Sequence, residues 1–129
     1  MRLLLDTHVL LWLLSGHDRI DKSTREVLSD PANDVLFSAA SIWEIAIKSQ
    51  LGRLDFGYRS EEIAQAARES GLEELPVRSS AASRVASLPM HHRDPFDRLL
   101  IAQAIAEPAR LYTADGILSA YSELVTLIG

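Results

Sequence analysis

The chain has 129 residues, of which 47% are hydrophobic and 24% charged, and its formal net charge is −5. The length predicts one domain, residues 1–129, and this composition is typical of soluble folded chains. The absence of cysteine excludes disulfides, thiolate metal sites and thiol nucleophiles. The chain has no membrane-length apolar run and no cleavable basic leader, so we expect a cytoplasmic protein. The acidic net charge disfavours nucleic-acid binding through a basic surface that contacts the phosphates. This objection does not hold if several carboxylates line one pocket and hold divalent cations.

The first residues predict a buried strand that ends at an aspartate. Residues 3–5 are leucines without polar alternation, and the apolar residues of 9–14 recur at helical spacing. Asp6 therefore lies at the carboxyl end of a strand, which is where ligands bind in open parallel sheets. The alternative is that Asp6 or Thr7 only caps the following helix, and capping is the default expectation for Thr7.

The rest of the chain continues to alternate short apolar runs with helical patterns. Helices are predicted over residues 22–28, 39–51, 61–69, 79–87 and 95–107, and strands over 35–38, 72–77, 110–113 and 124–128. Loops are expected at 15–18, 55–60 and 88–94, and a turn at 115–116 opens one helical turn. This order predicts an α/β fold, a three-layer α/β/α sandwich with a mostly parallel central sheet of about five strands.

Two aspartates follow predicted strands that are candidates for neighbours in the sheet. If the first and fourth strands lie side by side where the strand order switches, Asp6 and Asp115 face the same crevice. Thr113 lies beside the second of these strand ends, where its hydroxyl either holds a water or a carboxylate or caps the local chain. The pair of aspartates is the strongest indication of a site that spacing alone provides.

Glu44 lies in a predicted helix that is apolar on nearly every side. It shares a line with Ala40, Ile47 and Leu51, which aims it inward. There it needs a metal or a basic partner, because burying an ionised carboxylate costs several kcal/mol. The alternative is an exposed ion pair with Lys48 at i,i+4 spacing, and the spacing does not decide between the two.

Asp94 and Asp97 have different predicted roles at the start of one helix. Asp94 precedes Pro95 and is interpreted as the helix N-cap. Asp97 lies in the first turn, where the helix dipole favours an acid whatever its function. It also shares the core-facing stripe with Leu100 and Ile101, so it lies at a rim suited to a cation ligand.

Four carboxylates in a chain without cysteine form an oxygen-ligand set that suits Mg²⁺ or Mn²⁺ rather than structural zinc. They are Asp6, Glu44, Asp97 and Asp115. Such an ion activates water and neutralises the charge that develops on a phosphodiester. Adjacent His91 and His92 lack the spacing of a helical zinc pair, so we interpret them as part of a loop that contacts substrate or solvent.

The sequence predicts the roles of two further pairs of residues less specifically. Arg93 and Arg98 flank the acidic residues and are candidate phosphate contacts, although Arg98 is equally well explained as a solvated helix residue. Trp12 and Trp43 lie on apolar stripes and are predicted core residues.

Together these residues resemble the PIN-domain ribonucleases, specifically the VapC-type toxins of bacterial toxin–antitoxin pairs. The matching segments are LLLDTHVLLW at 3–12, SAASIWEIAIKSQLGRL at 38–54, HHRDPFDRLLIAQA at 91–104 and LYTADG at 111–116. Each segment alone is modest, but their shared order and spacing over nearly the whole chain are specific.

The resemblance implies a Mg²⁺- or Mn²⁺-dependent endoribonuclease that hydrolyses RNA phosphodiester bonds through a metal-activated water. It implies Asp6 and Asp97 as principal metal ligands, with Glu44 and Asp115 completing the site directly or through water. Thr113 matches the family's threonine or serine. The implied partners are the RNA substrate, a second copy in a homodimer and a small VapB-like antitoxin, with a higher assembly as an option.

The resemblance also ranks the two aspartates of the DPFDR segment. Asp97 has the family's spacing to the Leu-Ile-Ala residues that follow, so Asp94 is the additional, supporting neighbour.

Two other classes of protein place acidic residues in similar positions. A signalling receiver domain requires a late lysine, and no lysine follows Lys48. A binding protein whose carboxylates recruit a basic peptide without turnover is the other alternative.

Overall fold

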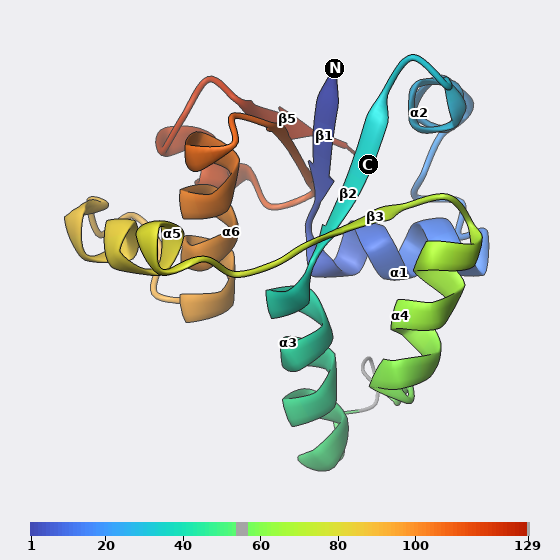
Figure 1. Ribbon diagram of the computed structural model, residues 1–129, viewed down its shortest axis with the longest axis horizontal. Coiled ribbons are helices and arrows are strands. Elements are labelled where there is room, and N and C mark those ends of the chain that lie inside the picture. Colours follow the sequence, from blue (N-terminus) through green and yellow to red (C-terminus); the bar gives the residue numbers. More distant parts are fainter. Residues whose placement is uncertain (54–56, 129) are drawn as a thin grey trace.

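The computed structural model describes residues 1–53 and 57–128. Within these residues the strands form one sheet in the order β3-β2-β1-β4-β5, and every neighbouring pair is parallel. The strands are β1 Arg2–Leu5, β2 Asp34–Ser38, β3 Glu73–Leu75, β4 Arg110–Thr113 and β5 Val125–Leu127. The helices are α1 Thr7–Ser15, α2 Lys22–Ser29, α3 Ala39–Gln50, α4 Ser60–Glu69, α5 Ser79–Arg84 and α6 Pro95–Ala106, with 3₁₀ segments η2 Val85–Ser87 and η3 Gly116–Ala120 (Figure 1).

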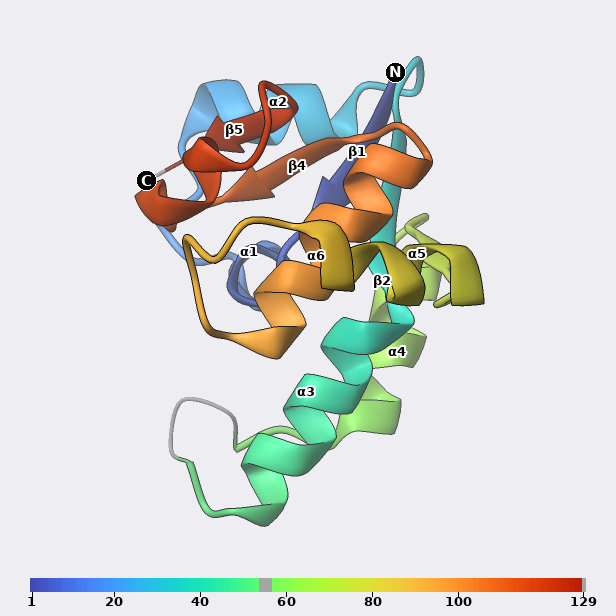
Figure 2. The ribbon, with the colours of Figure 1, turned by 90° about the vertical axis from the view of Figure 1, so that its left-hand side faces the viewer.

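The central strand is buried on both faces because helices cover both sides of the sheet. Leu3 and Leu5 of β1 pack in a cluster with residues of α1, α2 and α4, whereas Leu4 packs in a second cluster with residues of α6 and η3. Alternate side chains of a strand point to opposite faces, so consecutive leucines supply both clusters. Figures 1 and 2 show the three layers that result, which confirms the predicted α/β/α sandwich.

The strand order confirms the neighbours on which the predicted site depends. β1 pairs with β4, with Leu5 opposite Tyr112, and the Asp6 N–H donates to the Tyr112 carbonyl at 3.0 Å. The carboxyl ends of both strands therefore meet at one edge of the sheet, and the residues that follow them approach each other. The strand predicted over residues 72–77 corresponds to β3, which lies at the edge of the sheet with Glu73 and Glu74 exposed.

The predicted elements differ from the observed ones mainly at their ends. The helix expected over 79–87 divides into α5 and the tighter segment η2. The observed strand β3, Glu73–Leu75, is shorter than the strand expected over 72–77. Of the loop expected at 55–60, residues 55 and 56 lie outside the described residues, and Ser60 already begins α4. Among the helices that the structure describes, none has the length and apolar character to cross a membrane.

The prediction that Trp43 is a core residue is wrong, since the side chain is 58% exposed. Helix α3 extends beyond the carboxyl ends of the strands, so part of its apolar surface has no sheet to pack on (Figure 2). Trp43 instead contacts the ring of Phe96 edge to face, with the ring centroids 5.2 Å apart. Trp12 is half-buried against the core, as expected.

Candidate metal centre

Asp6 both caps α1 and belongs to the candidate site. Its Oδ1 accepts the Val9 N–H at 2.8 Å, and its Oδ2 accepts the Thr113 hydroxyl at 2.5 Å. The same Thr113 oxygen accepts the Asp115 N–H at 3.0 Å, so both roles considered for this threonine are present. Only 7% of Asp6 is exposed. The strand end, the helix cap and the loop after β4 therefore fix one carboxylate in place.

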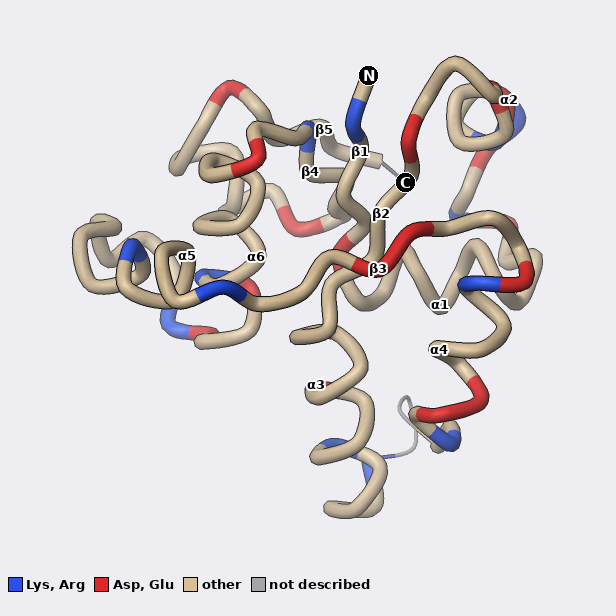
Figure 3. Tube along the Cα trace, viewed as in Figure 1, with Lys and Arg blue, Asp and Glu red and all other residues tan. Residues whose placement is uncertain are grey.

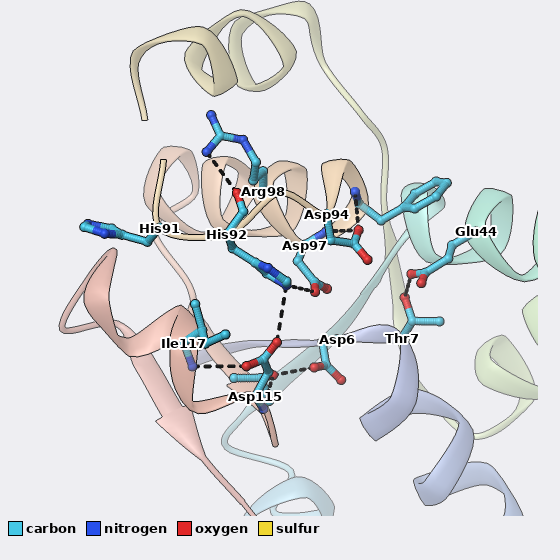
Figure 4. A network of polar contacts seen from close by, with 12 residues as sticks. Asp6, Thr7, Glu44, His91, His92, Asp94, Asp97, Arg98, Asp115 and Ile117 are labelled. Carbon is cyan, nitrogen blue, oxygen red and sulfur yellow. Dashed lines mark hydrogen bonds and ion pairs between the residues drawn. The ribbon is translucent and has the colours of Figure 1, made fainter. Parts of the chain in front are cut away.

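Asp97 and Asp115 approach each other through the imidazole ring of His92. His92 Nε2 lies 2.9 Å from Asp97 Oδ2 and 3.3 Å from Asp115 Oδ2. Figure 4 shows these three side chains and Asp6 converging from α6, the loop before it and the two strand ends. Asp94 caps α6 as predicted, because its Oδ1 accepts the N–H groups of Phe96 and Asp97 at 2.8 and 3.2 Å.

These side chains line an open hollow of about 390 Å³ at the carboxyl edge of the sheet. Its lining residues are Asp6, His8, Trp12, His92, Asp94, Asp97, Ala114 and Asp115. The crevice predicted between the first and fourth strands is therefore present, and three of the four predicted carboxylates line it.

Glu44, the fourth, lies beside the hollow rather than in its lining. It is 3% exposed, its Oε1 accepts the Thr7 hydroxyl at 2.6 Å, and its Oε2 pairs with Lys48 at 2.5 Å. The inward orientation and the Lys48 pair, considered as alternatives, occur together because Lys48 is the basic partner that a buried carboxylate needs. The capping role expected for Thr7 is wrong, since Asp6 is the N-cap of α1.

Burial, together with the charges of neighbouring acids, raises the pKa of Asp6 and of Asp97. Burial raises the pKa of Asp6 from its usual 3.8 to about 6, opposed by the hydrogen bonds from Thr113 and Val9 and helped by the charges of Glu44 and Asp115. Burial and the charge of Asp94 raise the pKa of Asp97 to about 6, opposed by the hydrogen bond to His92. A cation in the hollow would relieve both the loss of solvation and the repulsion.

These shifts predict how stability depends on pH in the absence of metal. Because Asp6 binds its proton more tightly when folded, the folded state holds more protons between pH 3.8 and about 6. The free energy of unfolding should therefore fall as the pH rises through this window, by up to about 3 kcal/mol from Asp6. Urea unfolding in chelator at several pH values measures this, and Asp6→Asn should flatten the dependence. An Asp6→Asn curve parallel to that of the wild type would contradict the assignment.

Arg98 serves the loop before α6 rather than solvent or the hollow. It is 7% exposed, and its guanidinium donates to the carbonyls of Val85 and Pro89, each at 3.0 Å. It also donates to the Tyr121 hydroxyl at 3.1 Å, and in Figure 4 it points away from the carboxylates. The solvated alternative is therefore wrong, and this geometry gives the side chain no direct reach to a phosphate in the hollow. Arg93, in contrast, is exposed.

Comparison with known families decides what kind of domain carries this site. A family model described as PIN domain matches residues 3–124. The chain belongs to the PIN domain family. This membership removes the receiver-domain alternative. Comparison of this PIN domain with curated proteins gives no match.

Solved structures similar to this PIN domain share its fold at low sequence identity. VapBC2 from Rickettsia felis, bound to a DNA fragment from their promoter, gives a TM-score of 0.73 at 17% identity, with all of both chains covered. A toxin–antitoxin complex from Klebsiella pneumoniae gives 0.66 at 19% identity, covering 95% of this chain and 94% of that chain. VapC20 from Mycobacterium tuberculosis, described as a sarcin-ricin loop cleaving toxin, gives 0.63 at 20% identity, covering 94% and 97%.

The residue that sequence reasoning missed is His92. The sequence predicts both histidines in a loop that contacts substrate or solvent and argues against a zinc pair. The structure separates them, with the His92 ring among the acids and His91 exposed against Tyr121. The available signal was the position of His92 directly before the Arg-Asp-Pro segment that starts α6. In the described residues, His92, Asp97 and Asp115 place ligand atoms within 4.8 Å of one another.

Proposed function

We propose that this PIN domain is a metal-dependent endoribonuclease that acts as a VapC-type toxin. The observation that carries the proposal is the convergence of Asp6, Asp97 and Asp115 on one open hollow, with the pKa values of Asp6 and Asp97 raised. A set of carboxylate oxygens matches the ligand preference of Mg²⁺ and Mn²⁺. The acidic net charge then does not oppose RNA binding, since bound cations invert the local field.

The residues of the chain have distinct roles in the proposed reaction. Asp6 and Asp97 are the principal ligands, and Asp115 and Glu44 complete the site directly or through water. A divalent ion bound there supplies a water of lowered pKa and neutralises charge on the phosphodiester. Thr113 fixes the orientation of the Asp6 carboxylate, and Asp94 holds the first turn of α6 that presents Asp97.

RNA contacts outside the hollow fall to exposed basic side chains near α5 and α6. Figure 3 shows basic segments near α5 and α6. Arg84 lies in α5, Arg78 directly before it and Arg93 just before α6, and all three are exposed. Arg93 immediately precedes Asp94 and is therefore the proposed phosphate contact closest in sequence to the site.

The proposed partners follow from the family resemblance and the solved relatives. The Rickettsia felis and Klebsiella pneumoniae structures are toxin–antitoxin assemblies, which supports a small antitoxin as the natural inhibitor of this chain. A basic side chain of that antitoxin placed in the hollow would neutralise the same carboxylates as the metal. We propose a homodimer as the form of the toxin.

The decisive experiment is RNA cleavage by purified protein that is free of antitoxin. Structured RNA incubated with Mg²⁺ or Mn²⁺ should be cut internally, EDTA should abolish cleavage, and excess metal should restore it. The readout is the size of labelled fragments on a denaturing gel. Intact RNA with bound metal would instead favour the binding-protein alternative, and cleavage that persists in EDTA would contradict the proposed chemistry.

A further inference from the structure

The His92 ring lies between two carboxylates of the hollow. Its Nε2 is 2.9 Å from Asp97 Oδ2 and 3.3 Å from Asp115 Oδ2, and its side chain is 21% exposed. Neighbouring ligand atoms around an octahedral ion with bonds of about 2.1 Å lie about 3 Å apart. The distances from His92 Nε2 to the two carboxylate oxygens therefore match those between ligands of one shared ion. They also match the distances of hydrogen bonds.

The backbone of His92 is anchored from two sides, so the ring is not a loosely placed surface group. The Tyr121 hydroxyl accepts the N–H groups of His91 and His92 at 3.0 and 2.8 Å. Arg98 donates to that same hydroxyl and lies 3.5 Å from the His92 carbonyl. A ligand whose backbone is fixed in advance loses little entropy when it binds an ion.

The same anchoring separates two adjacent histidines. His91 turns outward, is exposed, and contacts the Tyr121 ring edge to face at 4.9 Å, while His92 turns into the hollow (Figure 4). A role in keeping this loop soluble would be met by two exposed imidazole rings. It does not explain why the His92 ring lies between two carboxylates.

We propose that His92 is a direct nitrogen ligand of the divalent ion that Asp97 and Asp115 bind, and that it shifts the preference of the site from Mg²⁺ toward Mn²⁺. This inference rests on the proposed metal-dependent function. Mg²⁺ is a hard ion held by oxygen, whereas first-row transition ions also accept imidazole nitrogen. The oxygen ligands make the site suitable for both ions, and His92 distinguishes between them. Tyr121 and Arg98 are positioning residues that act through the His92 backbone.

The test compares His92→Gln with His91→Gln, a matched change one residue away that leaves the hollow intact. Titration calorimetry of the chelator-treated protein with Mn²⁺ and with Mg²⁺ gives both affinities for each variant. His92→Gln should weaken Mn²⁺ binding by about 10–100-fold, the range typical of groups that support a metal site. Mg²⁺ binding should change by less than about threefold, because oxygen ligands hold that ion. His91→Gln should match the wild type with both ions.

Pulsed electron paramagnetic resonance of the Mn²⁺-loaded protein provides a readout that does not depend on activity. Coupling to a directly bound ¹⁴N nucleus should appear in the wild type and in His91→Gln and disappear in His92→Gln. Coupling that persists in His92→Gln would overturn the proposal and point to another histidine of the hollow, such as His8. Retained Mg²⁺ binding by His92→Gln shows that the site is still folded.

The outcomes separate this inference from the function on which it rests. If the wild type binds neither ion, the proposed metal-dependent function fails and His92 has no ion to bind. If the wild type binds both ions and His92→Gln binds them equally well, only the role of His92 is overturned.

Discussion

Replacing Asp97 by asparagine is expected to reduce the rate of RNA cleavage by more than about 100-fold. Mutating groups that only orient a metal ligand already lowers metal affinity or activity by about 10–100-fold. The same loss is expected for Asp6→Asn. Each substitution removes a charge that a bound cation needs while keeping the size of the side chain. Cleavage rates at saturating Mn²⁺, measured from fragment yields over time, provide the comparison.

The fold should survive both substitutions. Burial raises the pKa of Asp6 and of Asp97, which means that their charges oppose folding at neutral pH in the absence of metal. Thermal unfolding temperatures in chelator should therefore be unchanged or higher than that of the wild type. A lower unfolding temperature together with lost activity would indicate misfolding instead of a missing ligand.

Asp94→Asn is the matched control for Asp97→Asn. The carboxylate of Asp94 accepts two N–H groups at the start of α6, and asparagine is an equally good N-cap. This variant should therefore retain much of the activity. Complete loss of cleavage activity in folded Asp94→Asn would indicate that Asp94 is a metal ligand. Equal cleavage by the wild type, Asp6→Asn and Asp97→Asn would reveal a contaminating nuclease.

Replacing Arg98 by methionine is expected to lower the free energy of unfolding by about 3 kcal/mol. Methionine fills much of the same volume, but it removes the guanidinium that donates to the carbonyls of Val85 and Pro89 and to the Tyr121 hydroxyl. Hydrogen bonds to a charged group contribute about 1.5–3 kcal/mol each, and partial access of water reduces the sum. Urea unfolding monitored by circular dichroism measures the change.

Arg93→Met is the control, because Arg93 is exposed and five residues earlier on the same segment. It should change the free energy of unfolding by less than about 0.5 kcal/mol, as is typical of surface substitutions. Its expected effect is weaker RNA binding with a smaller dependence on salt. If Arg98→Met unfolded like the wild type but lost RNA binding, the Arg98 guanidinium would have to face the RNA.

The sequence alone determined the features that depend on residues close together in the chain. Short unbroken apolar runs placed the strands and helical spacing placed the helices. The Asp94-Pro95 pair identified the start of α6, because caps and periodicity act over about four residues. The aspartates at two strand ends predicted the crevice once a parallel sheet was expected.

Only the tertiary structure decided the features that depend on distant contacts. Whether Glu44 is buried depends on its contact with Thr7, which lies 37 residues earlier. The His92 ring turns inward because the His92 backbone N–H donates to the hydroxyl of Tyr121, 29 residues later. Trp43 is exposed because α3 extends beyond the carboxyl ends of the strands. Local periodicity contains no information on such contacts, since it records which residues are apolar but not what packs against them.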